Sequence, residues 1–436
     1  MRYHLVTLGC PKNAVDSEHL VRLLSQARHE AAPSAAAADI LVVNTCGFID
    51  ASIKESTDTV RQLARSKRPG QKLVVAGCMT QLYGPRLQAE VPAVDAVFGV
   101  NQWEQVAELF GPGEADTIDI PETRRLTARP SAYLKISDGC DRPCTFCIIP
   151  TIKGRMTSSP PDDLVARARQ FAAEGVKELV LVAQDSTDYA SDLGSRDGLA
   201  DLLLRLAEEV PELPWIRIMY AYPGAVSRRL ARVMASLPQV CHYLDVPLQH
   251  GSQAVLRRMK RPSNPDTVRA MLETLRSEMP DIAIRTTFIV GSPGETEAEF
   301  QELMAYAEEM QFDRVGVFTY SPQKGTPMEG MAAQLPEKLK RRRYRELMEL
   351  QQAISYQKNL AQVGRELDVL VESEPGQEDE QGPIFVGRTY RDAPEVDGMA
   401  VCRGVAQPGE LVRVRIGAAG VYDVFGSPVH ELALVG

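Results

Sequence analysis

The sequence predicts an α/β protein of three consecutive domains: an N-terminal open parallel α/β sheet, a central partial (β/α)6 barrel and a small antiparallel β-barrel of OB-like type. Three observations predict this class. The chain has 436 residues, whereas a single hydrophobic core rarely grows beyond roughly 250 residues. β-Branched runs alternate with amphipathic stretches over most of the chain, and the last part carries short strands separated by Gly turns. The expected domains are 1–125, 126–362 and 363–436.

The first domain is expected to form βαβ units around a parallel sheet. Its predicted strands are 3–8, 40–44, 72–76 and 96–100. A cysteine stands just past the end of each of the first three strands, namely Cys10, Cys46 and Cys78. Ligands bind outside the carboxyl ends of the strands of such a sheet, so three chain-distant thiols are expected to converge. They form either a ligand set for a bulky inorganic group, which the spacing favours, or three buried structural thiols.

The middle domain repeats a strand and a helix about six times, which predicts the partial barrel. Its predicted strands are 132–137, 178–184, 216–222, 243–248, 283–290 and 315–320. Amphipathic helices are expected at 162–173, 199–209 and 297–308, among others. Because barrel chemistry takes place at the carboxyl ends of the strands, the loops that follow these strands are the expected location of an active site.

Three further cysteines follow the first strand of this barrel, in a C-x-x-x-C-x-x-C spacing formed by Cys140, Cys144 and Cys147. A cubane iron-sulfur cluster normally takes four cysteine thiolates, so a cluster held by three leaves one iron open for another ligand. Structural zinc prefers four Cys or His ligands in paired C-x-x-C form, and this loop has no His. The spacing therefore favours a catalytic 4Fe-4S cluster over a structural zinc site, and makes a second such cluster the better interpretation of the first three cysteines.

Polar residues collect at the same predicted rim. Gln184 and Asp185 close the second strand, Gln249 closes the fourth, Thr286 lies in the fifth, and Gly291 follows the fifth. Each of these turns alone is compatible with an ordinary strand-to-helix turn and a capping residue, and for Asp185 a cap is nearly as plausible as a role in positioning substrate. Together they indicate a pocket.

The third domain is acidic. Its predicted strands are 367–372, 384–389, 399–403 and 411–416. Residues 365–436 contain thirteen acidic and six basic side chains, a net charge of −7, while the whole chain has a net charge of −9. Just before it, the basic run 338–343 lies on a predicted long helix, where a solvated face is the expected interpretation and a contact with ribosomal RNA the alternative.

Other features exclude several classes of protein. No stretch approaches 18 uninterrupted apolar residues, so no membrane span is expected, and the first residues lack the pattern of a secretory signal. Eight cysteines in 436 residues do not suggest a disulfide framework, and a reducing cytoplasm is the expected compartment. Cys241 and Cys402 are expected to be ordinary core or surface thiols.

The cysteine loop resembles that of the radical S-adenosylmethionine (SAM) superfamily, and the order of the three domains resembles the methylthiotransferases, whose C-terminal part is called a TRAM domain. The motifs that carry this resemblance are TLGCPKN at 7–13, NTCGFI at 44–49 and CIIP at 147–150. The resemblance implies two 4Fe-4S clusters and SAM, which serves as radical source and methyl donor. It places Phe146 beside the adenine. In the pocket expected at the rim of the barrel, Gln184, Gln249 and Thr286 are candidates to hydrogen-bond the ribose and carboxylate of SAM, and the turn at Gly291 is expected to let the backbone pass close to adenine.

Within this family, the Gln-Asp pair at 184–185, the sequence LQH at 248–250 and the sequence RTYRDAPEVDG at 388–398 resemble the RimO branch. That branch modifies an aspartate of ribosomal protein S-twelve, whereas the MiaB branch modifies tRNA. The net negative charge of the third domain also favours the RimO branch. Binding of tRNA needs a basic surface, whereas an acidic domain attracts a basic ribosomal protein. No direct tRNA binding is therefore expected. One departure is Ser159, where the family usually has an arginine that Arg155 is a candidate to replace.

Radical chemistry suits this substrate, because hydrogen on an aspartate β-carbon is not acidic enough for a side-chain base. The resemblance implies that the Cys140 triad cleaves SAM and that the Cys10 triad handles the transferred sulfur. A flavodoxin or ferredoxin is expected as reductant, since no flavin or nicotinamide motif is present. Two alternatives stay open: a tRNA methylthiotransferase modifying an adenosine next to the anticodon, and a non-catalytic iron-sulfur electron carrier. The source of the sulfur, the oligomeric state and the residue that receives the substrate carboxylate are also left open.

Overall fold

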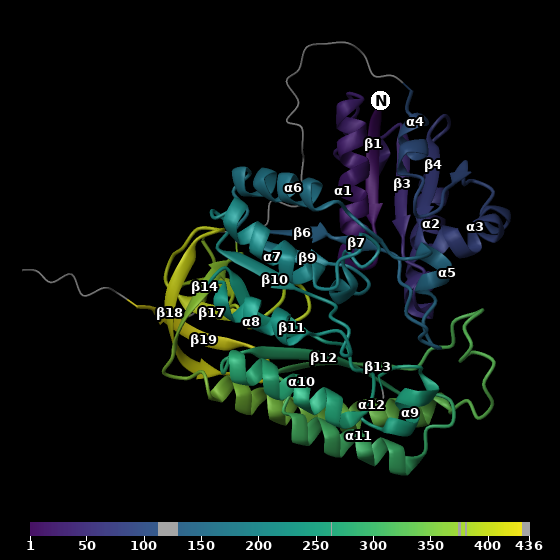
Figure 1. Ribbon diagram of the computed structural model, residues 1–436. Helices are drawn as coiled ribbons and strands as arrows, with labels where there is room; N and C mark the ends of the chain where they lie inside the picture. Colours follow the sequence, from purple (N-terminus) through teal and green to yellow (C-terminus); the bar gives the residue numbers. More distant parts are fainter. Residues whose placement is uncertain (112–129, 263, 374–375, 380–381, 430–436) are drawn as a thin grey trace, which may run out of the picture.

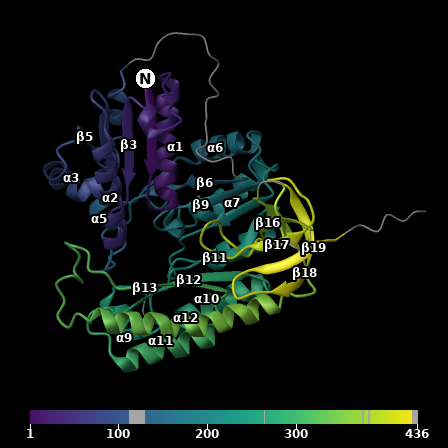
Figure 2. The same ribbon diagram turned by 180° about the vertical axis from the view of Figure 1, so that it is seen from behind.

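The computed structural model describes residues 1–111, 130–262, 264–373, 376–379 and 382–429. Three sheets follow one another along the chain, and Figures 1 and 2 show the first and the last of them on different sides of the central one. This arrangement confirms the predicted α/β class with a parallel sheet, a partial barrel and a small β-barrel. The expected boundary between residues 125 and 126 lies outside the described residues.

The N-terminal sheet is parallel, with the strand order β2-β1-β3-β4-β5. Its strands are β1 (Arg2–Thr7), β2 (Glu30–Ala31), β3 (Ile40–Thr45), β4 (Lys72–Gly77) and β5 (Ala96–Val97). Helices α1 (Pro11–Gln26) and α4 (Trp103–Glu108) cover one face, and α2 (Asp50–Ser66) and α3 (Cys78–Glu90) cover the other. In β3, alternate side chains therefore enter different cores: Ile40 and Val42 pack with α1, whereas Leu41 and Val43 pack with α2 and α3.

The central sheet has six parallel strands in chain order, as predicted. They are β6 (Ser131–Lys135), β9 (Glu178–Val182), β10 (Trp215–Ile218), β11 (Val240–Asp245), β12 (Ala283–Val290) and β13 (Arg314–Thr319). No pairing joins β6 to β13 in the described residues, so the barrel stays open. The helices outside it are α6 (Pro161–Ala173), α7 (Gly198–Glu209), α8 (Arg228–Ser236), α9 (Gln253–Arg258), α10 (Pro265–Glu278), α11 (Glu297–Met310) and α12 (Glu337–Leu360).

Short elements surround the cysteine loop of this domain. They are the antiparallel ribbon of β7 (Ser137–Asp138) and β8 (Thr157–Ser158), helix α5 (Ile149–Lys153) and the 3-10 helix η2 (Ser186–Asp188). The loop with Cys140, Cys144 and Cys147 lies between β7 and α5. It therefore begins just beyond the carboxyl end of β6, as the barrel rule requires.

The C-terminal domain is a closed barrel of five strands, in the order β14-β18-β19-β17-β16, with β14 paired to β16. Its strands are β14 (Glu366–Val371), β16 (Gly382–Arg388), β17 (Ala400–Arg403), β18 (Leu411–Ala419) and β19 (Val424–Pro428), with the short β15 (Glu378–Asp379) paired to β16. The sequence did not predict β19. In this strand only Val424 is buried and Phe425 is exposed, so the apolar alternation that identifies a strand is missing.

The C-terminal barrel covers the inner face of the open barrel. Val180, Val182 and Tyr243 of the central sheet share a core with Leu370 and Ala393 of the last domain. Buried ion pairs join the two domains: Arg388 with Glu178, Arg314 with Asp392, Arg391 with Asp313, and Arg285 with Asp397. Two acidic residues of the third domain, Asp392 and Asp397, are therefore partners of arginines in this interface, with 4% and 2% of their side chains exposed.

The basic run on α12 is only partly solvated, so the expectation of a solvated face is wrong for two of its residues. Lys340 and Arg343 are buried, with 3% and 2% of their surface exposed. The Lys340 ammonium donates to the carbonyl oxygen of Tyr320, and the Arg343 guanidinium donates to Glu295 at 2.8 Å. The two residues are three positions apart and so share the helix face that packs against the barrel.

Cys241 and Cys402 are buried in the apolar cores of the central and C-terminal domains, respectively, which confirms that they are ordinary thiols. Among the described helices, none combines the length and the apolar character that crossing a membrane requires.

Candidate active site

The first cysteine triad lies at the carboxyl ends of three neighbouring strands. Cys10 is the N-cap residue of α1 directly after β1, Cys46 follows β3, and Cys78 begins α3 directly after β4. Because β1, β3 and β4 are adjacent in the sheet, their ends bring the three thiols to one edge. This edge faces the central domain, as the arrowheads of β1 and β3 in Figure 1 show.

Glycines allow the three segments to approach closely. Gly9 has a φ of +98°, and a Cβ atom placed on it would lie 2.7 Å from Cβ of Cys46. A Cβ atom on Gly47 would lie 2.8 Å from the backbone nitrogen of Met79. Side chains at these two positions would therefore push the cysteine-bearing segments apart.

Asn13 joins the same three segments, and sequence reasoning missed this role. Its side-chain amide donates to the carbonyl oxygens of Leu8, at 2.8 Å, and Thr45, at 3.2 Å, and its carbonyl oxygen lies 3.7 Å from Sγ of Cys78. Its position in the motif TLGCPKN, three residues after Cys10, was the available signal.

The first triad has the donor chemistry of an iron-sulfur site. Burial raises the pKa of Cys78 to about 12, the nearby Lys153 ammonium opposes this, and the thiols of Cys46 and Cys10 raise the pKa further. Burial also raises the pKa of Cys46, to which Cys10 again contributes. All three thiols are free, and three soft sulfur donors that sense one another's charge suit a cluster of iron.

The second triad lies on a loop fixed by backbone contacts. The backbone nitrogen of Cys140 donates to the carbonyl oxygen of Gly154 at 3.2 Å, and that of Thr145 donates to Met259 at 3.1 Å. Burial raises the pKa of Cys147 to about 12, and the neighbouring thiols of Cys144 and Cys140 add to this effect. All three thiols of this loop are free and half-buried.

No three His, Cys, Asp or Glu side chains of the described residues converge closely enough to share a single metal ion. Each cysteine of a cubane binds a different iron, so its ligands lie further apart than those of a mononuclear site. The two triads thus fit a polynuclear cluster better than one zinc ion.

One cysteine of the first triad lies at the domain junction, near the loop of the second triad. Cys78 packs in one apolar cluster with Ile148 and Ile152, and Ile148 directly follows Cys147 of the second triad. Their neighbours in this cluster are Leu82 and Val100.

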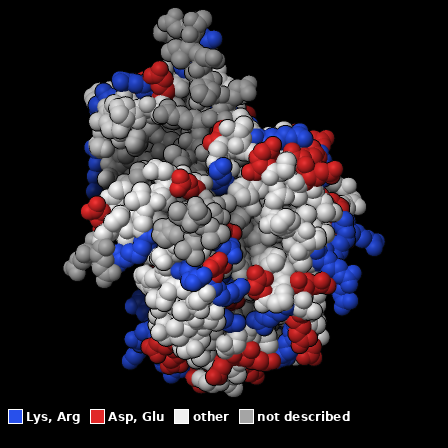
Figure 3. All heavy atoms as spheres, turned by 90° about the vertical axis from the view of Figure 1, so that its left-hand side faces the viewer, with Lys and Arg blue, Asp and Glu red and all other residues white. Residues whose placement is uncertain are grey.

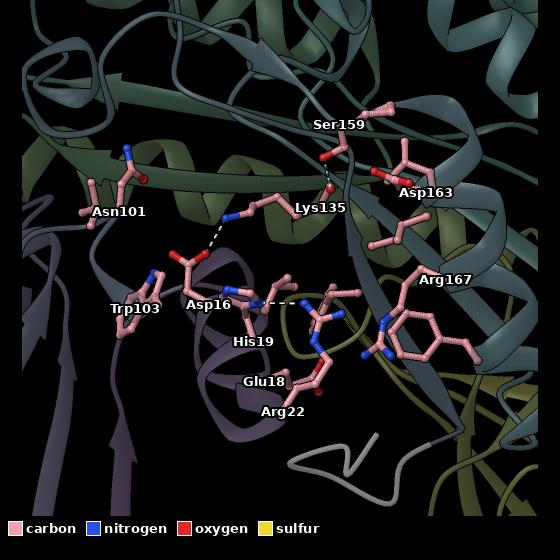
Figure 4. A pocket seen from close by; sticks show the side chains of 17 residues that line it. Asp16, Glu18, His19, Arg22, Asn101, Trp103, Lys135, Ser159, Asp163 and Arg167 are labelled. Atoms are coloured by element: carbon pink, nitrogen blue, oxygen red, sulfur yellow. Dashed lines mark hydrogen bonds and ion pairs between the residues drawn. The ribbon is translucent and has the colours of Figure 1, made fainter. Parts of the chain in front are cut away.

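Four charged residues join the same two domains. Lys153 donates to Asp16 and Asp138 at 3.0 Å each, and Lys135 contacts the same two carboxylates. Burial alone would raise the pKa of Asp138, but the two ammonium groups outweigh it and lower the pKa to about 2. Figure 4 shows Lys135 of β6 pointing toward Asp16 of α1. No sequence signal indicated this quartet, because its members are far apart in the chain.

Asp16 and Lys135 of the quartet line a cavity of about 310 Å³ between α1 and α6, to which Arg22, Trp103 and Arg167 also contribute (Figure 4). None of the six triad cysteines is among the described residues that line this cavity. It is therefore separate from the site described above.

Around the second triad, aromatic and cationic side chains gather. Phe146 packs with Met259 and Tyr320. The ring of Tyr222 lies between two guanidiniums, those of Arg142 and Arg261, each 4.3 Å from its centroid. Arg261 also approaches Sγ of Cys144, at 3.7 Å.

Gln184 and Asp185 have different surroundings. The Gln184 amide donates to Asp138 at 2.7 Å, while its buried Oε1 has no partner in the described residues. Asp185 accepts from the backbone of Thr187 and from Nε of Arg142, at 2.7 Å. Asp185 therefore has the capping role that the sequence allowed, and Gln184 keeps a free acceptor for a ligand.

The other three predicted contacts lie on the side of β11 and β12. Gln249 is half-buried and has a φ of +78°, a left-handed conformation that few residues other than glycine adopt. Thr286 is fully buried and already bonds to Val246 and Leu248, so a contact with SAM would require an exchange of these bonds. A Cβ atom on Gly291 would lie 2.4 Å from Cγ of Lys340. Packing against Lys340 therefore leaves no space for a side chain at this position, whether or not the glycine contacts adenine.

The departure at Ser159 has a local structural setting. Its hydroxyl lies 3.5 Å from the carbonyl oxygen of Lys135, and its own carbonyl accepts from Tyr189. Arg155 has 91% of its side chain exposed and pairs with Asp141 at 3.4 Å. A role of Arg155 in place of the missing arginine stays a prediction.

Three family descriptions match successive parts of the chain. The uncharacterized protein family UPF0004 matches residues 2–99, the radical SAM superfamily residues 134–307, and the TRAM domain residues 363–429.

Curated relatives match almost the whole chain. A protein of Chloroflexus aurantiacus is 48% identical over 98% of this chain and 99% of its own length, and one of Roseiflexus sp. is 45% identical over 99% and 98%. A protein of Anaeromyxobacter sp. is 45% identical over 98% and 93%. Each carries the name ribosomal protein uS12 methylthiotransferase RimO.

Solved structures share the fold. The radical SAM methyltransferase TsrM of Kitasatospora setae, with cobalamin and a [4Fe-4S] cluster bound, has a TM-score of 0.56 at 14% identity and covers 75% of this chain and 77% of its own. The cobalamin-dependent radical SAM enzyme OxsB has a TM-score of 0.53 at 12% identity, covering 80% and 56%. With full-length relatives at 45–48% identity and all three domains in the same order, the chain belongs to the RimO family of methylthiotransferases.

Proposed function

We propose that this chain adds a methylthio group to the β-carbon of an aspartate in ribosomal protein uS12, using SAM and two 4Fe-4S clusters. The observation that carries the proposal is the junction of the first two domains, where Cys78 of one triad shares an apolar cluster with Ile148, the residue that follows Cys147 of the other. Sulfur insertion at one carbon needs a radical source on one side of the substrate and a sulfur carrier on the other. Two adjacent triads supply both positions.

The residues of this chain have separable tasks. Cys140, Cys144 and Cys147 would hold one cluster, and Cys10, Cys46 and Cys78 the other. When bound, the first cluster supplies the electron that cleaves SAM, and the second supplies the site for the sulfur. The β-carbon then loses one hydrogen and gains a C–S bond, an exchange that a side-chain base does not achieve at an unactivated carbon.

The chain's polar and apolar side chains would orient and shield this reaction. Phe146, Gln184 and Gln249 line the rim on which SAM is expected, and the free Oε1 of Gln184 is suited to accept a hydrogen bond from it. Ile148 and Ile152 keep the junction between the triads apolar, which protects a reactive intermediate from water.

The charge of the C-terminal domain supports a basic protein substrate. Asp368, Glu378, Glu395 and Glu410 are exposed on this domain, and Asp368 pairs with the exposed Arg413 at 3.2 Å. On the face seen in Figure 3, Lys and Arg are interspersed with Asp and Glu and form no continuous basic field. Acidic groups on the domain steer a Lys- and Arg-rich protein and disfavour the phosphates of tRNA. The cytoplasm, where thiols stay reduced, is the proposed compartment, and a flavodoxin or ferredoxin the proposed reductant.

Mass spectrometry of uS12 after incubation with the reconstituted enzyme, SAM and dithionite tests the proposal. We expect the mass increment of one methylthio group on a single aspartate and no product on tRNA in a parallel reaction. Methylthiolated adenosine with unmodified uS12 would instead favour the tRNA enzyme. Formation of no 5'-deoxyadenosine would indicate an electron carrier.

Iron quantification tests the two-cluster arrangement separately. Replacement of either triad by alanine should leave about four irons per chain, compared with about eight in the unmodified protein. A reconstituted wild-type chain with only about four irons would contradict the second cluster.

A further inference from the structure

Lys12 connects the N-terminal domain with the rim of the central barrel. It lies two residues after Cys10 in the first turn of α1. Its side chain reaches out of this domain, and its ammonium lies 3.6 Å from the ring centroid of Tyr220 and 3.4 Å from the carbonyl oxygen of Ala183. Lys12 as a whole residue is half-buried, and its two contacts place the ammonium at the junction of the two domains.

The ammonium of Lys12 has unused hydrogen-bonding capacity. A lysine offers three donors, and one of them makes the long bond to Ala183. Asp138 and Asp245 act on Lys12 electrostatically, but no carboxylate of the described residues accepts a hydrogen bond from it. The ring of Tyr220 holds the charge by a cation–π contact, and Tyr220 itself has a positive φ of 61°, a strained conformation of the kind found at ligand sites.

Most neighbouring cations at this junction are paired with carboxylates. Lys135 and Lys153 share Asp16 and Asp138, Arg142 binds Asp185, and Arg285 binds Asp245. Arg261 is an exception, but it donates to Sγ of Cys144 and to the carbonyl oxygen of Pro247 and so belongs to the second triad. Lys12 is the cation next to the first triad to which no carboxylate of the described residues is hydrogen-bonded.

The position of Lys12 matches that of the substrate's own carboxylate. The proposed reaction requires the aspartate β-carbon to lie between the two triads, and its carboxylate is one bond away. Lys12 is two residues from Cys10 of the first triad. It also contacts Ala183, which precedes Gln184, and Gln184 bonds to Asp138, two residues before Cys140 of the second triad.

We propose that Lys12 binds the carboxylate of the substrate aspartate and thereby selects aspartate as the residue to be modified. The inference rests on the proposed function. Tyr220 and Ala183 hold the ammonium at the rim before substrate arrives, and the free donors of Lys12 then hydrogen-bond the carboxylate. Lys12 is thus a specificity residue that acts by direct contact.

A purely electrostatic role is the competing explanation. Lys12 lies close to Cys10, and its charge would stabilise an anionic cluster on the first triad. In that case its removal would affect cluster content but would not change the discrimination between aspartate and asparagine in the substrate.

Binding of full-length uS12 to the reconstituted holoenzyme separates these roles. Two enzymes, the wild type and Lys12→Met, are titrated with two substrates, uS12 with its aspartate and uS12 with asparagine at that position. We expect Lys12→Met to weaken binding of the aspartate form about 10- to 100-fold, the value of a hydrogen bond to a charged group. The asparagine form should bind both enzymes equally weakly, because the interaction is already lost. Lys12→Arg should restore part of the preference.

Two controls accompany this experiment. One is the iron content of each variant, and the other is Lys54→Met, which changes a lysine of α2 whose side chain is 77% exposed. Lys12→Met should keep about eight irons, and Lys54→Met should bind both substrates like the wild type. Equal preference for aspartate in wild type and Lys12→Met, or loss of iron from Lys12→Met with the preference retained, would overturn the inference. If the wild type neither binds nor modifies uS12, the proposed function itself fails.

Discussion

Lys153 of α5 donates a hydrogen bond to Asp16 of α1, with an Nζ to Oδ2 distance of 3.0 Å, and this pair links the domain of one cysteine triad to the loop of the other. Both side chains are buried, with 2% and 6% of their surface exposed. Lys153 also acts electrostatically on Cys78. The pair therefore fixes the relative position of the two triads, on which the proposed chemistry depends.

Breaking this pair should destabilise the protein. Lys153→Met leaves the buried carboxylates of Asp16 and Asp138 with Lys135 as their shared ammonium partner, and we expect a loss of about 3 kcal/mol in the free energy of unfolding. Urea denaturation measures it. Adding Asp16→Asn should recover part of the loss, because one uncompensated charge is removed. Replacement of the exposed Lys54 by methionine should lower the free energy of unfolding by less than about 1 kcal/mol. If the loss in free energy of unfolding of the double variant equalled the sum of the losses of Lys153→Met and Asp16→Asn, the two side chains would not interact and the role of the pair would be contradicted.

Acid should weaken the interface between the central domain and the C-terminal barrel. Burial alone would raise the pKa of Glu178, but the guanidiniums of Arg388 and Arg217 outweigh it and lower the pKa from 4.5 to about 2. A carboxyl with a lower pKa in the folded chain stabilises the fold above pH 4.5 and loses this contribution as the pH falls toward 2. Glu178→Gln should therefore lower stability at pH 7 and flatten its pH dependence between these values, as urea unfolding at several pH values can measure. Glu90→Gln should change the profile much less, because the ion pairs of Glu90 with Arg86 and Arg61 are exposed to water.

The sequence predicts the fold well where the signal is local. Strand β12 (Ala283–Val290) was predicted with both of its ends, because β-branched residues dominate this segment and Gly291 follows it. Strand β19 has only two strand-favouring residues, Val424 and Phe425, so its neighbours in the closed barrel, not its own side chains, determine its position. Likewise, the burial of Lys340 depends on Tyr320 and Gly291, which no helix periodicity reveals.

In the candidate site too, local sequence signals predicted some residues, whereas the roles of others depend on tertiary packing. Spacing within a loop singled out Cys140, and strand ends in a parallel sheet predicted that Cys10 would meet its partners. Gln184 was expected at the rim, but its contact with Asp138 depends on the packing of two loops. The tasks of Asn13 and Lys12 also remained hidden, because they arise only when segments distant in the chain come together.

A methyl group at Gly9 should disrupt the first triad selectively. Gly9 has a φ of +98°, and its added Cβ atom would meet Cβ of Cys46 at 2.7 Å and Sγ at 3.0 Å. We expect Gly9→Ala to retain about four irons per chain, those of the second triad, compared with about eight in the wild type. Gly70→Ala is a matched control, since Gly70 also has a positive φ, +82°, but nothing lies within 4 Å of its Cβ position. Full iron content in Gly9→Ala would show that the close approach is not required.

Arg261 should tune the reduction potential of the cluster on the second triad. Its Nη1 lies 3.7 Å from Sγ of Cys144, and a hydrogen bond from a cation to a ligating sulfur favours the more negative, reduced form. Arg261→Met should therefore lower the potential while the iron content stays at about eight per chain, and SAM cleavage with a weak reductant should slow more than cleavage with dithionite. Redox titration followed by electron paramagnetic resonance measures the shift. Arg155→Gln removes a positive charge that is 91% exposed and should leave the potential unchanged, so that equal shifts in both variants would point to general charge and not to the contact with Cys144.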